Sequence, residues 1–160
     1  RQDIMKKLTL AALALISPLA AHADSTVVDL EQELICLAEN IYHEARGEWD
    51  RGQIAVAHVT LNRVAHPYWP DTICEVVYDP GQFSWTAYDV EDVMSDPVAW
   101  ERAVYFAVDA FLGRSEDPTD GAVFYHTTWL DSPSWAEHET TEEYITIGEH
   151  VFYTWTGRWY

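Results

Sequence analysis

Residues 38–53 read AENIYHEARGEWDRGQ, and this stretch predicts where one helix ends and the next begins. Apolar side chains recur every three or four residues before and within it, a spacing typical of an amphipathic helix over residues 29–46. Gly47 then offers a place for that helix to stop. The apolar positions are Leu30, Leu34, Leu37, Ala38, Ile41 and Ala45.

A second helix is predicted to start immediately afterwards. Asp50 can cap its first turn, and Gln53, three residues later, fits the partner position of a capping box. The two helices therefore form a tight hairpin. The side chains predicted to face inward on the second helix are Ile54, Ala57, His58, Leu61 and Val64.

Glu44 is an unexpected residue on the inner face of the first helix. At about 100° per residue it lies only about 20° from Leu37 around the axis, so it faces the same side as the core leucines. Desolvation there raises the pKa of a carboxyl group and keeps it protonated near neutral pH, the state that a general acid needs. The alternative is a helix-end glutamate that turns to solvent or pairs with Arg46 or Arg51.

The second half of the chain predicts a third helix and a small sheet. After a long aromatic-rich loop over residues 79–95, Asp96-Pro97 is typical of a helix start, and Gly113 of its end. The segment AVFYHTTW, residues 122–129, has the composition of a strand, and Gly148-Glu149 separates two alternating runs as a hairpin turn does. The predicted core stripe of the third helix is Trp100, Val104, Ala107, Val108 and Phe111.

The first 23 residues have the features of a cleaved signal peptide. Lys6 and Lys7 precede an apolar run, and AHA at residues 21–23 provides the small residues that signal peptidase reads. The run is too short to span a bilayer stably, so we expect cleavage before Asp24, export to the periplasm or the medium, and no stable membrane insertion afterwards. Residues 24–160 are long enough for a single domain with its own core.

The chain is strongly acidic. It has 27 Asp and Glu residues against 9 Lys and Arg residues, which gives a net charge of −18. Such a surface argues against nucleic acid and anionic lipid as partners, because both are bound through basic patches.

Cys36 and Cys74 both lie in the part of the chain expected to be exported, where the environment is oxidising. We predict a disulfide between them, which would stabilise the fold by closing a long loop. The alternative is two separate buried thiols.

Four ordered blocks of the sequence resemble one known family. They are CLAENIYHEARGEWDRGQIAVAHVTLNRV at residues 36–64, YWPDTICEVVY at 68–78, GQFSW at 81–85 and GAVFYHTTWLDSPSW at 121–135. In order and spacing they are similar to the germination-type cell wall hydrolases, the spore cortex-lytic (SleB/CwlJ-like) family. The resemblance implies an α+β, mainly α fold, with a lysozyme-like helical core and a small antiparallel β-sheet or hairpin. It also implies cleavage of the glycan strands of peptidoglycan.

The resemblance further implies which residues form the site. The family's catalytic glutamate is the first of the EARGE motif, which falls on Glu44, and no cofactor is implied. The residues expected to contact the saccharide are Glu48, Gln82, Phe83, Ser84, Tyr125 and His126, although Glu48 also suits a helix N-terminus. Flat faces for sugar rings are offered by Phe83, Trp85 and Trp135.

The number of carboxylates bears on the reaction. Cleavage needs a proton on the leaving oxygen while the sugar becomes oxocarbenium-like. An N-acetylmuramidase that hydrolyses the bond also needs a second carboxylate, and the candidates Glu48 and Asp50 are not compelling. A lytic transglycosylase needs none, because the C6 hydroxyl of muramic acid attacks C1 and the same glutamate takes its proton. We therefore favour the product with 1,6-anhydromuramic ends.

Other functions stay open from the sequence. His43, His126, His138 and His150 are available to a metal-dependent amidase or peptidase, but YHEARGE lacks the second histidine of HExxH. A non-catalytic wall-binding module would keep an aromatic cleft and dispense with the acid. Spore enzymes of this family often add a wall-binding domain that this sequence does not display, so we expect that an unidentified partner recruits the protein or that the cleft does all the binding.

Overall fold

The computed structural model describes residues 19–88, 95–138 and 140–157. The chain divides into two units, residues 1–31 and residues 32–160, and the fold discussed below is that of the second unit. Most of the expected signal peptide, residues 1–18, lies outside the described residues, so its cleavage stays a prediction. None of the helices in the described ranges is long and apolar enough to cross a membrane.

The described residues form four α-helices and one short 3₁₀ helix. The predicted boundary between the first two helices is confirmed, because α1 ends at Ala45 and α2 begins at Asp50. The capping box is wrong: Trp49 occupies the N-cap without a side-chain bond, and Gln53 Nε2 donates to the backbone oxygen of Glu48 instead, at 3.1 Å. The helices are α1 (Leu19–Ala45), α2 (Asp50–Val64), α3 (Ile73–Val77), η1 (Ser84–Ala87) and α4 (Pro97–Phe111).

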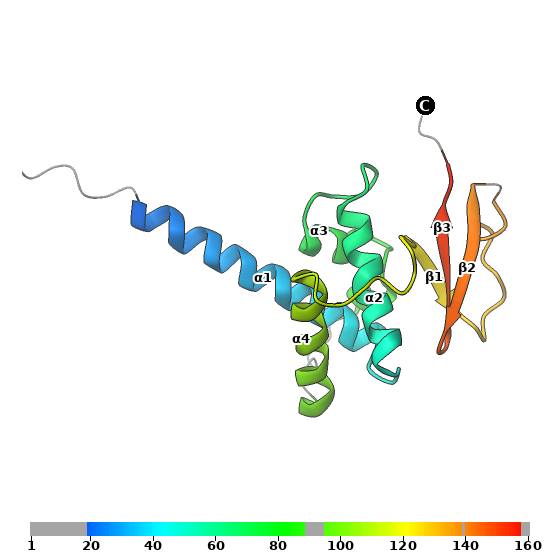
Figure 1. Ribbon diagram of the computed structural model, residues 1–160, viewed down its shortest axis with the longest axis horizontal. Coiled ribbons are helices and arrows are strands. Elements are labelled where there is room, and N and C mark those ends of the chain that lie inside the picture. The colour runs from blue at the N-terminus through cyan, green and yellow to red at the C-terminus, as the bar shows by residue number, and fades with distance from the viewer. Residues whose placement is uncertain (1–18, 89–94, 139, 158–160) are drawn as a thin grey trace, which may run out of the picture. The chain divides into compact units, whose positions relative to one another are not determined.

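The helix α2 packs on two sides, between the other helices and the sheet (Figure 1). Ala57 belongs to the helical core with residues of α1, α3 and α4, and Ile54, Leu61 and Val64 pack against this core. The residues that face the sheet are Ala55 and Val59. The sequence predicted one buried face for this helix, whereas the structure buries a second face against the sheet.

The start of α4 agrees with the sequence prediction, and its core stripe agrees in part, because Ala107 is buried and Trp100 packs against the helical core. Asp96 Oδ1 accepts hydrogen bonds from the backbone N–H groups of Val98 and Ala99, as a cap does. Of the five predicted stripe residues, Val104 and Phe111 are each 37% exposed. The buried residues are Ala103, Phe106, Ala107 and Ala110. The prediction followed the larger side chains, whereas α4 buries a face rich in alanine that lets it approach its neighbours closely.

Three antiparallel strands form the sheet, in the order β1-β3-β2. They are β1 (Phe124–Thr127), β2 (Thr141–Ile147) and β3 (His150–Trp155), so both the predicted strand and the predicted hairpin are confirmed. Gly148, with φ +59°, occupies the two-residue turn between β2 and β3. The expected α+β, mainly α fold with a small antiparallel sheet is the one observed.

The two faces of the sheet have different surroundings. Adjacent residues of a strand point to opposite faces. On β1, Tyr125 packs with Phe152 against the α2 side, whereas His126 stacks on Tyr153 and approaches Trp135 on the other face. The alternation therefore separates two residues that are neighbours in the sequence.

A disulfide joins Cys36 of α1 to Cys74 of α3, with an S–S distance of 2.10 Å, as the sequence predicts. Beside it, Glu33 Oε2 accepts hydrogen bonds from the backbone N–H groups of Ile73 and Cys74 at the start of α3. The disulfide and this carboxylate together fix α3 on the helix that carries Glu44.

Candidate active site

Glu44 lies in the last turn of α1, on the side that the helical spacing predicts. Its neighbours toward the core, Ile41 and Ala45, are fully buried. Burial raises the pKa of the Glu44 carboxyl above its usual range, and this effect outweighs two opposing ones, a hydrogen bond from Tyr125 and the charge of Arg63. The carboxyl is thus held closer to its protonated form than a surface glutamate.

Tyr125 of β1 supplies the direct partner of this carboxyl. Its hydroxyl donates to Glu44 Oε2 at 3.0 Å. Burial, together with the nearby Glu44 carboxylate, raises the pKa of Tyr125 well above its usual value, so its hydroxyl stays a donor. The sequence named Tyr125 as a candidate, and the fold brings it to Glu44 from 81 residues further along the chain.

Arg63 of α2 is the third member of the site, and the sequence analysis did not identify it. Its side chain is 5% exposed, Nε donates to the carbonyl of Val123 at 2.8 Å, and its charge acts on both Glu44 and Tyr125. Among the described atoms, its Nη1 has no hydrogen-bond partner. A buried, unpaired N–H close to the Glu44 carboxyl is suited to bind an oxygen of a substrate. The sequence feature that could have identified it is a charged residue in the last turn of an otherwise amphipathic second helix.

We expect Arg63→Lys to lower the free energy of unfolding by ~1–3 kcal/mol, because an ammonium group cannot reproduce the planar Nε–H bond to Val123 and leaves that carbonyl unpaired. Urea unfolding measures the difference. Arg114→Lys, at an exposed position, is the matched control and should change stability by less than ~0.5 kcal/mol. Equal effects of the two substitutions would contradict the role assigned to Arg63.

The loop that carries Gln82 and Ser84 is fixed to the site by buried aromatic residues. Trp85 Nε1 donates to Asn40 Oδ1 at 3.1 Å, and Asn40 Nδ2 donates to Thr60 Oγ1 at 3.1 Å. Asn40 stands one helical turn before Glu44 on α1. Gln82 is half-buried and Ser84 exposed, so both flank buried anchors and have accessible surface near the site.

Phe83 is placed differently from the sequence prediction. It is 3% exposed, belongs to the helical core, and lies 5.1 Å from the guanidinium carbon of Arg63. Trp85 is also buried, in the same core. Neither ring has a free face for a sugar, so the prediction that Phe83 and Trp85 stack on the saccharide is corrected. These rings support Arg63 and the loop instead.

Glu48 and His126 are not brought to Glu44 as substrate contacts. The Glu48 carboxylate is turned inward, where Oε1 accepts from the N–H of Glu149 at 2.9 Å, and its side chain is 8% exposed. His126 lies on the sheet face opposite Tyr125, with Nε2 2.9 Å from the Tyr153 hydroxyl. The expectation that these two residues contact the same saccharide as Glu44 is therefore revised.

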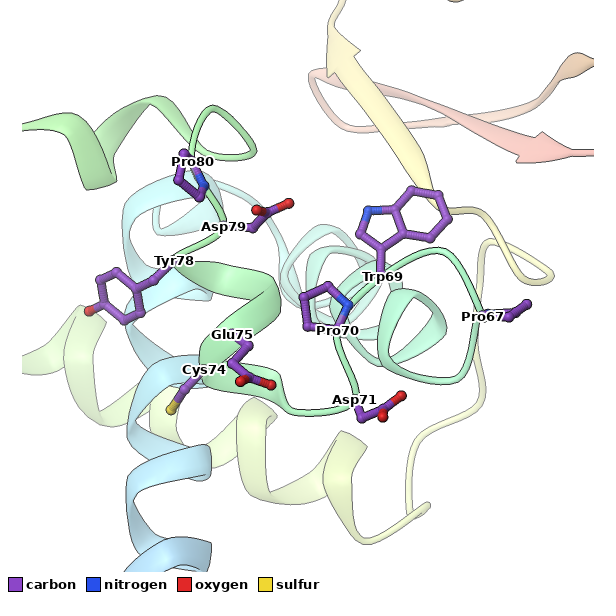
Figure 2. Close-up of a pocket in the computed structure, with 9 residues that line it drawn as sticks. All are labelled: Pro67, Trp69, Pro70, Asp71, Cys74, Glu75, Tyr78, Asp79 and Pro80. Carbon is purple, nitrogen blue, oxygen red and sulfur yellow. The ribbon is translucent and has the colours of Figure 1, made fainter.

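A pocket of about 850 Å³ opens among the residues labelled in Figure 2. It is formed by the loop after α2, by α3 and by the segment that follows α3. One lining residue, Asp79, interacts electrostatically with Arg63, and another, Trp69, lies 5.8 Å from the Arg63 guanidinium carbon. The lining residues are Pro67, Trp69, Pro70, Asp71, Cys74, Glu75, Tyr78, Asp79 and Pro80. Asp79 is thus a carboxylate near the site that the sequence analysis did not single out.

The histidines considered for a metal site are dispersed. His43 stacks on Trp85 with ring centroids 4.4 Å apart, whereas His138 bonds to Thr140 and His150 lies in the sheet. Within the described ranges, no three His, Cys, Asp or Glu side chains are grouped so that they could hold a metal ion.

Comparison with known proteins places this geometry in a family. Residues 47–153 match the family described as Cell Wall Hydrolase, a match that begins three residues after Glu44. Among curated relatives, the spore cortex-lytic enzyme of Halalkalibacterium halodurans is 34% identical over 122 residues, which cover 76% of this chain and 34% of that protein. The spore cortex-lytic enzyme of Bacillus cereus is 30% identical, over 76% of this chain and 44% of that protein.

Solved structures give the same assignment. The catalytic domain of SleB from Bacillus cereus is 32% identical, with a TM-score of 0.58, over 76% of this chain and 89% of that chain. The catalytic domain of the germination-specific lytic transglycosylase SleB from Bacillus anthracis is 31% identical, with a TM-score of 0.59, over 75% of this chain and 92% of that chain. The chain spans less than half the length of the curated relatives but nearly all of these catalytic domains. It therefore belongs to the cell wall hydrolase family.

Proposed function

We propose that this protein cleaves the glycan strands of peptidoglycan, with Glu44 as the proton donor. The observation that carries the proposal is the buried Glu44 carboxyl, whose pKa is raised by desolvation and whose Oε2 accepts a hydrogen bond from Tyr125 at 3.0 Å. A carboxyl whose pKa is raised by burial and which is held in one orientation by a hydrogen bond has the properties of a general acid. The similarity of the chain to the catalytic domain of a lytic transglycosylase supports the activity.

The reaction is a lytic transglycosylation. Glu44 gives its proton to the glycosidic oxygen, and the bond from C1 of muramic acid to that oxygen breaks. The C6 hydroxyl of the same sugar then attacks C1, and the Glu44 carboxylate takes the hydroxyl proton, which restores the acid. No water is consumed, and the new end is a 1,6-anhydro sugar. Arg63 stabilises the carboxylate that exists between the two proton transfers.

The distribution of carboxylates favours this reaction over hydrolysis. Glu48 is bonded to the β2–β3 turn, and Asp50 pairs with Arg102 on the surface. Neither is seen to contact Glu44 among the described residues, and both carboxylates are already engaged by other groups. Asp79, which interacts with Arg63, is the remaining candidate for the second carboxylate of a hydrolase. The similar catalytic domain from Bacillus anthracis is that of a lytic transglycosylase, which supports the same choice.

Two parts of the molecule are proposed to bind the glycan strand, the loop of Gln82 and Ser84 and the pocket. Gln82 and Ser84, on the loop anchored by Trp85, offer hydrogen bonds to sugar hydroxyls. The pocket lined by Trp69 and Asp79 offers an indole ring and a carboxylate, the combination that binds the apolar face and the hydroxyls of a saccharide.

The cellular setting follows from the substrate. We propose that residues 1–23 direct export and are removed, and that residues 24–160 act as one catalytic domain on wall peptidoglycan in the periplasm or outside the cell. The disulfide agrees with an oxidising compartment.

Tyr125→Phe should move the pH dependence of kcat/KM in a defined direction. The Tyr125 hydroxyl lowers the pKa of Glu44, so its removal raises that pKa further. Because the acid must be protonated to react, the basic limb should shift to higher pH, by ~1 unit for the loss of one hydrogen bond to a charged group. A shift to lower pH, or none, would contradict the assignment of the acid.

Release of soluble fragments from purified, insoluble peptidoglycan tests the function against its rivals. The protein should clear the suspension without added metal, keep its activity in a chelator, and leave stem peptides intact. Cut stem peptides together with inhibition by the chelator would establish the amidase or peptidase alternative. Binding without any release by the wild-type protein would establish the wall-binding alternative.

A further inference from the structure

Glu48 is buried at the turn between α1 and α2, and the reaction proposed for Glu44 does not use it. Its backbone is fixed at both ends: its N–H donates to the carbonyl of Ala45 at 2.9 Å, and its carbonyl accepts from Gln53 Nε2 at 3.1 Å. A buried carboxylate is costly unless its oxygens have partners. The partners of Glu48 therefore indicate its role.

Those partners belong to the β2–β3 turn. The N–H of Glu149 donates to Glu48 Oε1 at 2.9 Å, and the same oxygen lies 3.5 Å from His150 Nδ1. The carboxylate fits between two glycines, since a Cβ added at Gly148 would lie 1.8 Å from Oε2, and one added at Gly52 would lie 2.8 Å from the Cβ of Glu48. Glu48 thus fastens the α1–α2 turn to the hairpin turn, with no space for a side chain at either glycine.

Residues of the β2–β3 hairpin contact Tyr125, the hydrogen-bond partner of Glu44. The His150 ring meets the Tyr125 ring edge to face, with centroids 5.2 Å apart, and Phe152, paired with Tyr125 in the sheet, lies 5.6 Å from it. The Tyr125 hydroxyl then donates to Glu44 Oε2. Glu48 and Glu44 are close in the sequence, and they are also linked by contacts that run through the sheet: from Glu48 to the hairpin turn, from His150 to Tyr125, and from Tyr125 to Glu44.

We propose that Glu48 is a positioning residue: it docks the β2–β3 turn on the α1–α2 turn and so holds the Tyr125 hydroxyl on Glu44. The inference rests on the function proposed for Glu44 and extends it. It also replaces the prediction from the sequence that Glu48 contacts the saccharide.

The docking works through hydrogen bonding and packing rather than through an ion pair. Burial lowers the pKa of His150, while the charges of Glu48 and Glu149 oppose this effect and His126 adds to it. His150 is therefore neutral at neutral pH and does not form an ion pair with Glu48. What matters for the docking is the oxygen of Glu48 that accepts the Glu149 N–H, not the charge of the carboxylate. Glutamine at this position retains the acceptor for the Glu149 N–H, whereas alanine removes it.

A carboxyl ¹³C NMR titration of Glu44 is the experiment, with its signal assigned from the spectrum of Glu44→Gln. Tyr125→Phe serves as the reference: the rise of the Glu44 pKa in this variant measures the complete loss of the Tyr125 hydroxyl. Glu48→Ala should produce a shift in the same direction and lower kcat about 10- to 100-fold with little change in KM. Glu48→Gln should restore most of both quantities. The matched control, Glu142→Ala on the exposed side of β2, should change neither.

The titration separates this inference from the proposed function, because it needs no substrate. If wild type releases no glycan fragments, the function fails whatever the titration gives. If folded Glu48→Ala leaves the Glu44 pKa at the wild-type value, the inference is overturned. A rise in KM alone would overturn it too and would make Glu48 a substrate contact. Should Glu48→Ala not fold, Glu48→Asp tests the same point, because its shorter side chain withdraws the oxygen from the Glu149 N–H.

Discussion

Glu44→Gln should reduce the rate of glycan cleavage by ~10²–10⁴-fold, since an amide cannot give a proton to the leaving oxygen and general acid catalysis contributes an effect of this size. The amide keeps the size of the side chain and an oxygen that accepts the Tyr125 hydrogen bond, so binding of the strand should change little. The rate of soluble fragment release, measured beside pull-down on insoluble peptidoglycan, distinguishes the two effects. Residual activity above ~10% of wild type would exclude Glu44 as the acid.

The stability of Glu44→Gln shows whether a loss of its activity comes from a loss of structure. Because burial raises the pKa of Glu44, the ionised form destabilises the folded protein, and stability increases as the pH falls through the folded-state pKa. Glu44→Gln removes this ionisation, so the variant should be more stable than wild type at neutral pH. The difference should shrink as the pH is lowered. A less stable variant would indicate that lost activity came from lost structure.

Removal of the Cys36–Cys74 disulfide should give the largest loss of stability. The two residues are 38 positions apart, and closing a loop of this length constrains the unfolded chain by about 3–4 kcal/mol in the chain-entropy model. The double variant Cys36→Ala/Cys74→Ala should therefore unfold at a clearly lower urea concentration.

Reduction of the wild-type protein is the matched comparison for that variant. With excess reductant, wild type should lose nearly the same free energy of unfolding, while the double variant should not respond. A loss below ~1 kcal/mol would mean that the Glu33 carboxylate and the packing of α3 suffice to hold this region without the bond.

Local patterns in the sequence were sufficient for much of the fold. The break between α1 and α2, the Asp96 cap and the Gly148 turn each depend on a few adjacent residues, and all three were predicted correctly. The inward face of Glu44 also follows from spacing alone. These features are set by backbone geometry close to the residues that reveal them.

Features that depend on tertiary packing were not predicted. The burial of α2 on two sides, and of the alanine face of α4, depends on which elements pack against these helices. The roles of Phe83 and Glu48 changed for the same reason, since an aromatic ring or a carboxylate in a family motif is equally compatible with a surface contact or a buried support.

Arg63 is the clearest example of a site residue that the sequence pattern does not reveal. Its position at the inner end of α2 resembles the helix-terminal cation that suits any C-terminus. Its function depends on Val123 and Tyr125, about 60 residues away, and no pattern near Arg63 indicates them.

The central claim is that one buried glutamate cleaves the strand without a second carboxylate, and mass spectrometry of the released fragments tests it most directly. Peptidoglycan digested by the protein of residues 24–160 should yield fragments that end in 1,6-anhydromuramic acid, each lighter by one water than a hydrolysis product, and Glu44→Gln should yield none. Ordinary reducing ends would contradict this mechanism and make Asp79 the first residue to test as the missing carboxylate.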